Sequence, residues 1–414
     1  MATYRDVVKL VERERLLAWR NGSVEINELM ASVLGARVCI DGCWGIASVQ
    51  GCEDESRVKQ LLEVAEKIAR SSPSCPGLSE AKLFRGSVSV GVEEIDFARV
   101  SDLASSLCSE AMEEGVEDCE VVVLHRIVER RIEGPEGVAE ERRSWVEVEA
   151  GLRMGSGFGS WRGFSIAWST SGVERLLEEV FRSASTVLRA SLKSRPLNPL
   201  NVGKALIVLD PEASAALIHE VSHLLTPPMG RELLGKRLGP NELNLVDDPT
   251  MMGVPSSRPF DDEGVECRRR VLIEGGTVVD LHHTRETAHA YGSAPGSAHG
   301  LFTKPIPFHT TLVLQPGDWR FEEIVEETRE GYLVTGVAMA TLEGGYVRLV
   351  PLASYRIEKG EVREPVRLRS VTIPVRFLRQ VDALGRELRA RYGYEKQWLV
   401  SEIAPAIRLP GYVG

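Results

Sequence analysis

Residues 205–228 read ALIVLDPEASAALIHEVSHLLTPP, and this stretch decides the fold of the second half of the chain. Its first five residues form an apolar run that is typical of a buried strand. Asp210 is a favourable N-cap, and Pro211 suits the first position of a helix. The pair Pro227-Pro228 ends the helical pattern, because proline has no N–H and clashes with the preceding turn. We therefore predict a strand followed directly by a helix.

The predicted helix contains His219-Glu220-Val221-Ser222-His223. His219 and His223 are four residues apart, so they share one helix face. Zinc is well matched by two neutral imidazole nitrogens, and Glu220 is placed to act as a general base toward water. The pattern predicts a zinc site that hydrolyses peptide bonds. The alternative is a helix that merely contains two histidines, one satisfied by a carboxylate or a carbonyl.

A third metal ligand is needed, because two imidazoles alone rarely hold zinc against water. Carboxylates and one thiol downstream of the motif are the candidates, namely Asp247, Asp248, Asp261, Asp262, Glu263, Glu266 and Cys267. Acidic residues beside proline and glycine are also standard in turns. We favour a structural turn for Asp247-Asp248 and leave both roles open for Asp261-Asp262-Glu263.

Other histidines carry weaker signals. His282 and His283 are adjacent in a strand-like stretch, so their side chains point to opposite faces and at most one could join a given site. We expect both to be packed or at the surface. His289, His299 and His309 lie in surroundings rich in glycine, proline and threonine, and they could line a substrate groove.

The first half of the chain alternates helical and strand-like periodicity. Two apolar runs joined across Asp41-Gly42 predict a tight hairpin. The other predicted elements are an amphipathic helix at 4–19, a helix at 55–70, several strands within 118–170 and a helix at 172–193. Prolines and asparagines then break the pattern near residue 196, which suggests a domain boundary.

We predict the α+β class with two domains, since 414 residues exceed one ordinary core. Residues 1–195 would form an N-terminal α/β domain, with a sheet packed by helices. Residues 196–414 would form a C-terminal β-rich domain that carries the His-Glu motif helix and one further helix near 374–391.

Composition limits the partners and the compartment. The formal net charge of -10 with scattered basic residues disfavours direct binding of nucleic acid. Seven irregularly spaced cysteines predict reduced, mostly buried thiols. The N-terminal residues lack the apolar core of a signal peptide, and no apolar run is long enough to span a membrane. We expect a cytoplasmic protein without a membrane partner.

Several motifs occur in an order that resembles the TldD/PmbA family, the so-called modulators of DNA gyrase. The matching stretches are Gly35–Val38, Trp44–Ser48, Val208–Ala213, the His-Glu motif, Asp247–Pro249, Phe260–Gly264, Val271–Gly276, Thr284–Ala288 and Tyr355–Gly360. The resemblance implies a cytoplasmic zinc peptidase with an N-terminal α/β domain and a β-rich catalytic domain. It also implies unfolded or flexible peptides as substrates, an enclosed cavity, and a homodimer or a heterodimer with a PmbA-like paralogue.

Two departures from the family pattern stand out. The family spaces its histidines as H-E-x-x-x-H, whereas here two residues separate Glu220 from His223. The family also has a cysteine ligand near the C-terminus, where this sequence has Tyr392, and no cysteine follows Cys267. The first hypothesis is therefore a peptidase with an unassigned third ligand. The alternative hypothesis is a non-catalytic subunit that completes the peptide-binding cavity of a partner.

Overall fold

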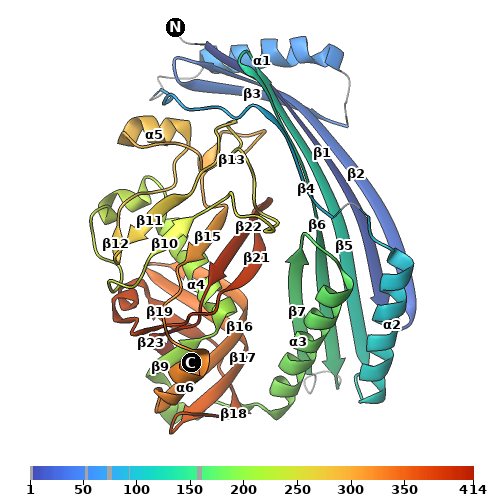
Figure 1. The fold of residues 1–414 in the computed structure, drawn as a ribbon, viewed down its shortest axis with the longest axis vertical. Coiled ribbons are helices and arrows are strands. Elements are labelled where there is room, and N and C mark those ends of the chain that lie inside the picture. The colour runs from blue at the N-terminus through green and yellow to red at the C-terminus, as the bar shows by residue number, and fades with distance from the viewer. Residues whose placement is uncertain (1–2, 52–54, 72–76, 93, 156–160) are drawn as a thin grey trace.

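The computed structural model describes residues 3–51, 55–71, 77–92, 94–155 and 161–414. A long curved sheet with its helices lies beside a second part built from residues after α3 (Figure 1). Long strands and separate helices confirm the predicted α+β class. The division at residue 195 stays a prediction.

The first part is a seven-stranded sheet in the order β3-β2-β1-β5-β6-β4, with β7 also paired to β6. Every neighbouring pair is antiparallel except β4 and β6. Its strands are β1 (Thr3–Arg20), β2 (Ser23–Ile40), β3 (Cys43–Gln50), β4 (Gly86–Gly91), β5 (Asp118–Gly134), β6 (Gly137–Met154) and β7 (Trp161–Ser169). The predicted hairpin is confirmed, because Ile40 pairs with Cys43 across Asp41-Gly42.

The predicted helix at 4–19 is wrong, because this segment is the strand β1. It pairs with β2 along its whole length and with β5 from Val7 onward. Val8 and Leu17 are both fully buried, but they lie on opposite faces of the sheet. A strand buried on both faces lacks clean alternation, and its apolar residues happen to fall at helical spacing.

Three helices cover one face of this sheet. They are α1 (Val58–Ser71), α2 (Phe97–Glu113) and α3 (Glu174–Lys193). The helices predicted at 55–70 and 172–193 are confirmed, and α2 was not predicted. Apolar side chains of α2 and α3 pack on Leu17, Val123 and Val148 of the sheet. Helix α1 approaches so closely that a Cβ atom on Gly45 would lie 1.8 Å from the carbonyl oxygen of Ala65.

The opposite face of the sheet meets the second part through buried charges. Arg37 lies on β2, is fully buried, and donates Nε to Asp6 at 2.8 Å. Its Nη1 atom donates to the carbonyl oxygen of Asp262 in the second part. Arg130 on β5 likewise donates to the carbonyl oxygen of Phe260 at 2.6 Å. Buried arginines of the sheet therefore hold the loop that contains Phe260 and Asp262.

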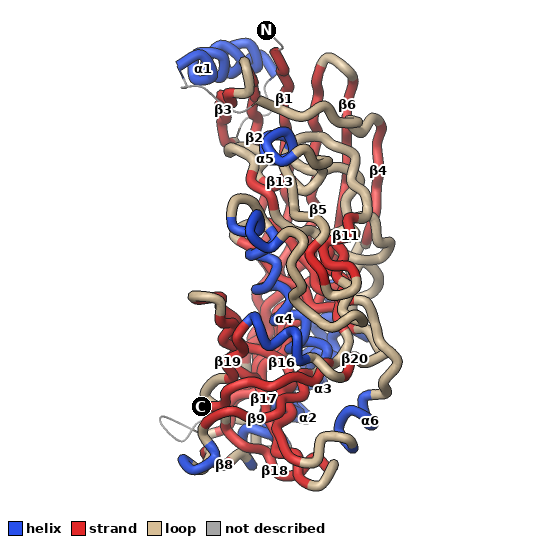
Figure 2. Tube along the Cα trace, turned by 90° about the vertical axis from the view of Figure 1, so that its left-hand side faces the viewer, coloured by secondary structure: helices blue, strands red, loops and turns tan. Residues whose placement is uncertain are grey.

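The second part contains two larger sheets and one two-stranded sheet (Figure 2). The six-stranded sheet has the order β12-β11-β10-β15-β22-β21, and its strands are β10 (Leu245–Asp247), β11 (Arg270–Glu274), β12 (Thr277–Val278), β15 (Thr311–Leu314), β21 (Arg389–Glu395) and β22 (Trp398–Ala404). The eight-stranded sheet comprises β8 (Arg195–Pro196), β9 (Gly203–Leu209), β16 (Glu330–Glu343), β17 (Tyr346–Glu358), β18 (Glu361–Arg367), β19 (Val371–Pro374), β20 (Ala383–Leu384) and β23 (Ile407–Val413). The small sheet pairs β13 (Ala298–His299) with β14 (Ile306–Pro307).

Helix α4 (Pro211–Ser222) lies between the two larger sheets, since it contacts β16 and β17 of one and β21 and β22 of the other. The strand predicted before it is confirmed as β9. The short helices α5 (Arg285–Tyr291) and α6 (Phe321–Glu326) lie outside this core. Most residues of α4 are buried, and Leu217 and Val221 belong to the largest apolar cluster. A helix enclosed by two sheets is a rigid support for side chains that point from it.

The helix predicted near 374–391 is wrong. Only Val375–Gln380 is helical, as a short 3-10 turn, and Arg389–Glu395 forms the strand β21. Strand β21 pairs with β22 along its full length. This long-range pairing overrides the local helical pattern.

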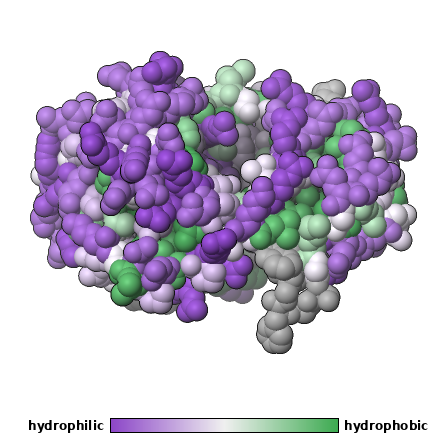
Figure 3. Space-filling view, turned by 90° about the horizontal axis from the view of Figure 1, so that it is seen from below, coloured by the Kyte–Doolittle hydropathy of each residue, from purple (hydrophilic) through white to green (hydrophobic). Residues whose placement is uncertain are grey.

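The cysteines depart from the expectation of reduced thiols. Cys108 on α2 and Cys119 on β5 form a disulfide inside the core, whereas Cys39 and Cys267 are free and buried. None of the helices in the described part of the chain is long and apolar enough to cross a membrane. Seen from below, hydrophilic residues cover most of the surface, with apolar residues in smaller groups between them (Figure 3).

Candidate metal centre

Helix α4 carries the two histidines of the motif to one place. Asp210 caps the helix by accepting a hydrogen bond from the N–H of Ala213 at 2.8 Å, and Pro211 occupies the first helical position. His219 lies in the last turn, and His223 begins the 3-10 turn that follows. Their ring centroids are 5.4 Å apart. The predicted capped helix with both imidazoles on one side is therefore present.

A third possible ligand comes from the end of β21. The Oε2 atom of Glu395 lies 3.7 Å from Nε2 of His219 and 3.9 Å from Nε2 of His223. Ligands of a tetrahedral zinc ion at about 2.0–2.1 Å are separated from each other by about 3.4 Å. Small side-chain movements would bring the three atoms to that spacing. Two imidazole nitrogens and one carboxylate oxygen are a ligand set that catalytic zinc sites use, so the residues fit this metal.

A second carboxylate holds the other nitrogen of His219. Nδ1 of His219 donates to Oε1 of Glu402 on β22 at 2.7 Å, and this carboxylate is fully buried. Nε2 of His309 lies 3.0 Å from the same oxygen. Arg391 on β21 donates to the other oxygen of Glu402 at 2.9 Å. His219, His309 and Glu402 thus form a second group close enough to hold a metal ion, and it shares His219 with the first.

These carboxylates decide the charge of the histidines. Burial opposes a charge on His219, but attraction to Glu402 and hydrogen bonds to Glu395 and Glu402 outweigh it and raise the pKa of His219 to about 9. Burial and the neighbouring His219 lower the pKa of His223. Despite its burial, Glu402 has a pKa well below the usual value because of His219. Without a metal, the site therefore holds one charged and one neutral histidine near neutral pH.

Glu220 lies beside this group on α4 and is largely buried. Burial raises the pKa of its carboxyl group, while the charge on His219 and the N–H of Leu342 partly offset that effect. A carboxylate whose pKa is raised toward neutrality is a more effective general base. The raised pKa thus agrees with the general-base role that the sequence predicts for Glu220.

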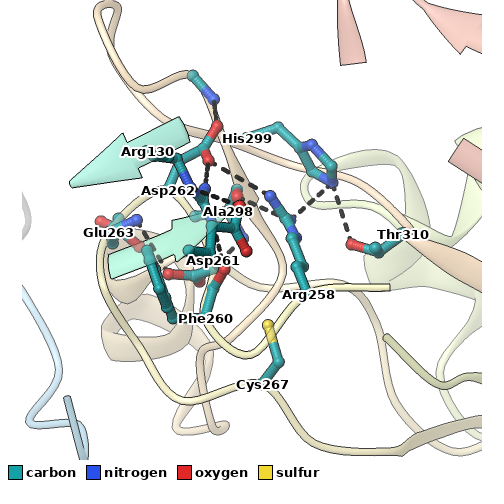
Figure 4. Close-up of polar contacts among 12 residues, drawn as sticks. Arg130, Arg258, Phe260, Asp261, Asp262, Glu263, Cys267, Ala298, His299 and Thr310 are labelled. Carbon is teal, nitrogen blue, oxygen red and sulfur yellow. Dashed lines mark hydrogen bonds and ion pairs between the residues drawn. The ribbon is translucent and has the colours of Figure 1, made fainter. Parts of the chain in front are cut away.

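The structure places four of the predicted third ligands, Asp261, Asp262, Glu263 and Cys267, in a separate buried cluster (Figure 4). Asp261 accepts hydrogen bonds from the backbone N–H groups of Glu263, Val265 and Ala298. Asp262 is paired with Arg130 and Arg258. Within the described residues, no possible metal-binding group includes Asp261, Asp262, Glu263 or Cys267.

The remaining members of that cluster are also engaged in structural contacts. Glu263 accepts a hydrogen bond from the N–H of Arg285 at 2.6 Å. Cys267 is buried, which raises the pKa of its thiol. Burial likewise raises the pKa of Asp261 and Glu263. Hydrogen bonds and ion pairs therefore engage Asp261, Asp262 and Oε2 of Glu263, whereas Oε1 of Glu263 is buried without a hydrogen-bond partner among the described residues.

The other candidate ligands have structural partners as well. Asp247 is buried and accepts hydrogen bonds from the N–H groups of Thr310 and Thr311. Asp248 accepts a hydrogen bond from the N–H of Thr250, as expected for a turn. The remaining candidate, Glu266, pairs with Lys82.

Among the other histidines, His309 alone belongs to a possible metal-binding group in the described part of the chain. His282 and His283 are buried, as the packed alternative predicts. His299 is also buried, and its Nε2 atom lies 3.0 Å from Arg258. His289 is exposed.

Sequence reasoning missed Glu395 and Glu402 as members of the site, and it named His309 only as a possible residue of a substrate groove. One signal was available for Glu395, because the family resemblance places a metal ligand at Tyr392, three residues earlier. Glu402 had no local signal, since 183 residues separate it from His219. Only strand pairing and the packing of β22 against α4 bring the two together.

The class of metallohydrolases with an HExxH helix is defined by this arrangement: two histidines from one helical segment, a carboxylate opposite them, and a glutamate beside the first histidine.

Residues 202–412 match the model of the PmbA/TldA metallopeptidase C-terminal domain family. The chain is 27% identical to a metalloprotease of Methanothermobacter thermautotrophicus, over 94% of this chain and 90% of that protein. It is 31% identical to a metalloprotease of Methanocaldococcus jannaschii, over 54% of this chain and 52% of that protein.

Solved structures show the same fold. A candidate modulator of DNA gyrase from Thermotoga maritima has a TM-score of 0.81 and 21% identity, over 99% of this chain and 96% of that chain. TldE from Thermococcus kodakarensis has a TM-score of 0.75 and 17% identity, over 99% of this chain and 96% of that chain. The chain therefore belongs to the TldD/PmbA family, whose named relatives are metalloproteases.

Proposed function

We propose that this chain is a zinc-dependent peptidase that hydrolyses unfolded or flexible peptides. The observation that supports this function is the approach of Glu395 Oε2 to within 3.9 Å of Nε2 of both His219 and His223. The three side chains would hold the metal. Glu220 lies next to the first of them in the chain and would act as the general base.

A zinc ion bound there would supply a Lewis acid, which polarises a carbonyl group and lowers the pKa of water. Glu220 would take a proton from the attacking water and return it to the leaving amine. His219 would remain oriented by its hydrogen bond to Glu402 throughout. The half-buried His223, whose side chain is 32% exposed, marks the side from which a peptide can reach the site.

Glu395 also bears on the alternative, a non-catalytic subunit. That hypothesis rests on the missing C-terminal cysteine, which leaves the two histidines without a third ligand. The carboxylate of Glu395, from the same C-terminal region, would supply that ligand here. We therefore favour a catalytic subunit with a His-His-Glu ligand set in place of one that contains cysteine.

The test measures metal content and peptide cleavage on the same purified protein. We expect about one zinc per chain by elemental analysis, and cleavage of an unstructured fluorogenic peptide that a chelator abolishes. Glu220→Gln should keep the zinc and lose cleavage by at least about 100-fold. Glu266→Gln is the matched control, because Glu266 pairs with Lys82 at the surface. Zinc-loaded protein that cleaves no peptide would instead support the non-catalytic subunit.

We further propose that the chain works as a homodimer or with a PmbA-like paralogue. One edge of the large sheet supports this, because β3 pairs with β2 only from Val33 onward, and residues 23–32 pair with β1 alone among the described strands. Val24, Ile26, Leu29 and Met30 are exposed there. Open edges with apolar side chains favour pairing with another chain. Light scattering of the unmodified protein should give the mass of a dimer, and Ile26→Lys should lower that mass. If the unmodified protein is a monomer, the PmbA-like paralogue remains the candidate partner.

A further inference from the structure

His219 belongs to two possible metal-binding groups, one on each ring nitrogen. Its Nε2 atom faces Glu395 and His223, and its Nδ1 atom faces Glu402 and His309. A metal ion that used Nδ1 would bind in a different place from one that used Nε2. The contacts of Glu402 distinguish between these two possibilities.

Glu402 already has a full set of partners. Its Oε1 atom lies 2.7 Å from Nδ1 of His219 and 3.0 Å from Nε2 of His309, and its Oε2 atom accepts from Arg391 at 2.9 Å. A metal ion at this carboxylate would have to displace both histidine contacts and lie beside a guanidinium charge. Such a position is unfavourable for a cation in a buried site. Glu395 is partly exposed, with 24% of its side chain accessible, and no arginine pairs with it in the described structure.

The support of Glu402 is rigid. Strand β22 is an inner strand of the six-stranded sheet, between β15 and β21, and it packs on α4. His309 makes a second connection to the same helix, because its Nδ1 atom lies 2.7 Å from Oγ of Ser222. The ring of His309 thus bridges Ser222 and Glu402. These contacts hold the carboxylate at a constant distance from His219.

We propose that Glu402 is a positioning residue that holds a proton of His219 on Nδ1, so that the metal binds at Nε2. Arg391 and His309 in turn hold Glu402 in place. A carboxylate behind a metal-binding histidine fixes the ring and makes the other nitrogen a stronger donor. The charge of Arg391 balances that of Glu402, so the pair can remain buried when His219 is neutral. This inference rests on the proposed function, because it concerns the same metal.

The experiment measures the affinity for Zn²⁺ by competition with a chromophoric chelator, and the visible spectrum of the Co²⁺-substituted protein. After correction for the proton that Zn²⁺ displaces from His219, Glu402→Gln should weaken Zn²⁺ binding by about 10–100-fold. Its Co²⁺ spectrum should keep the shape of the unmodified protein, because the ligands are unchanged. Glu395→Gln is the matched comparison and should change the spectrum, because it removes a ligand.

A second variant guards against misfolding of Glu402→Gln. Glu402→Asp keeps the charge but withdraws the carboxylate by one carbon, so it should weaken Zn²⁺ binding by a smaller factor. Unchanged proton-corrected affinity in both variants would refute the role of Glu402. A Co²⁺ spectrum altered by Glu402→Gln and by His309→Gln, but not by Glu395→Gln, would show that the metal uses Nδ1 and would also overturn the inference. Failure of the unmodified protein to bind either metal would instead refute the proposed function itself.

Discussion

Metal binding by this site should depend strongly on pH, because a proton competes with the metal for His219. The pKa of His219 is raised to about 9 in the metal-free protein, chiefly by Glu402 acting against burial. A group with a raised pKa holds its proton below that pH, so the metal must displace it. The pKa of His223 is lowered, and those of Glu395 and Glu402 are lowered as well, so these groups give up no proton near pH 7.

The expected change of metal affinity with pH follows from that single proton on His219. At pH 6.5 about one His219 ring in 300 would be neutral, and at pH 8.5 about one in four. The apparent affinity for the metal should therefore rise about 75-fold between these two values, close to tenfold per pH unit. Near pH 7, binding of one metal ion should release about one proton.

Isothermal titration calorimetry in buffers of different ionisation enthalpy measures that proton release directly. In Glu402→Gln the pKa of His219 should fall, because its main anionic partner is gone. The number of protons released per bound metal ion should then drop well below one. A flat affinity between pH 6.5 and 8.5, with no proton released by the unmodified protein, would show that His219 is neutral before the metal binds. The electrostatic role of Glu402 would then be wrong.

Three further predictions concern stability, each measured by chemical denaturation. The disulfide between Cys108 and Cys119 spans a sequence separation of 11, so Cys108→Ser should lower the free energy of unfolding by about 3 kcal/mol, and reductant should lower that of the unmodified protein by at least as much. Arg37→Met leaves Asp6 buried without its cation and should cost about 3–5 kcal/mol, most of which the double variant with Asp6→Leu should recover. Gly45→Ala should lower the free energy of unfolding by about 1–3 kcal/mol, because the added Cβ would meet the backbone of α1. An unchanged denaturation midpoint would contradict that close contact.

The sequence predicts only those residues of the site that lie on or beside helix α4. The N-cap Asp210, Pro211 and the histidine spacing are local signals, and each has its expected place in α4. The hairpin at Asp41-Gly42 is local in the same way. Short-range patterns suffice wherever hydrogen bonds and side-chain contacts form within a few residues.

The elements that were wrong or missed depend on distant partners. The segment at 4–19 has helical spacing, but pairing with β2 and β5 makes it a strand. Glu395 reaches the histidines only because β21 pairs with β22, and β22 packs on α4. No local pattern distinguishes such a glutamate from a charged residue at a hairpin end.

The ligand set also explains how the site can lack the C-terminal cysteine of the family pattern. A thiolate and a carboxylate both supply one negative charge to zinc, so the charge of the ligand set is unchanged when Glu395 takes that role. The side chain of glutamate is longer than that of cysteine. Glu395 is the last residue of β21, and from there its side chain can extend to both histidines. Glu402 then adds a second negative charge behind His219, and Arg391 compensates it. In the proposed site the two carboxylates therefore have separate tasks: Glu395 would supply the ligand, and Glu402 would orient the imidazole that binds beside it.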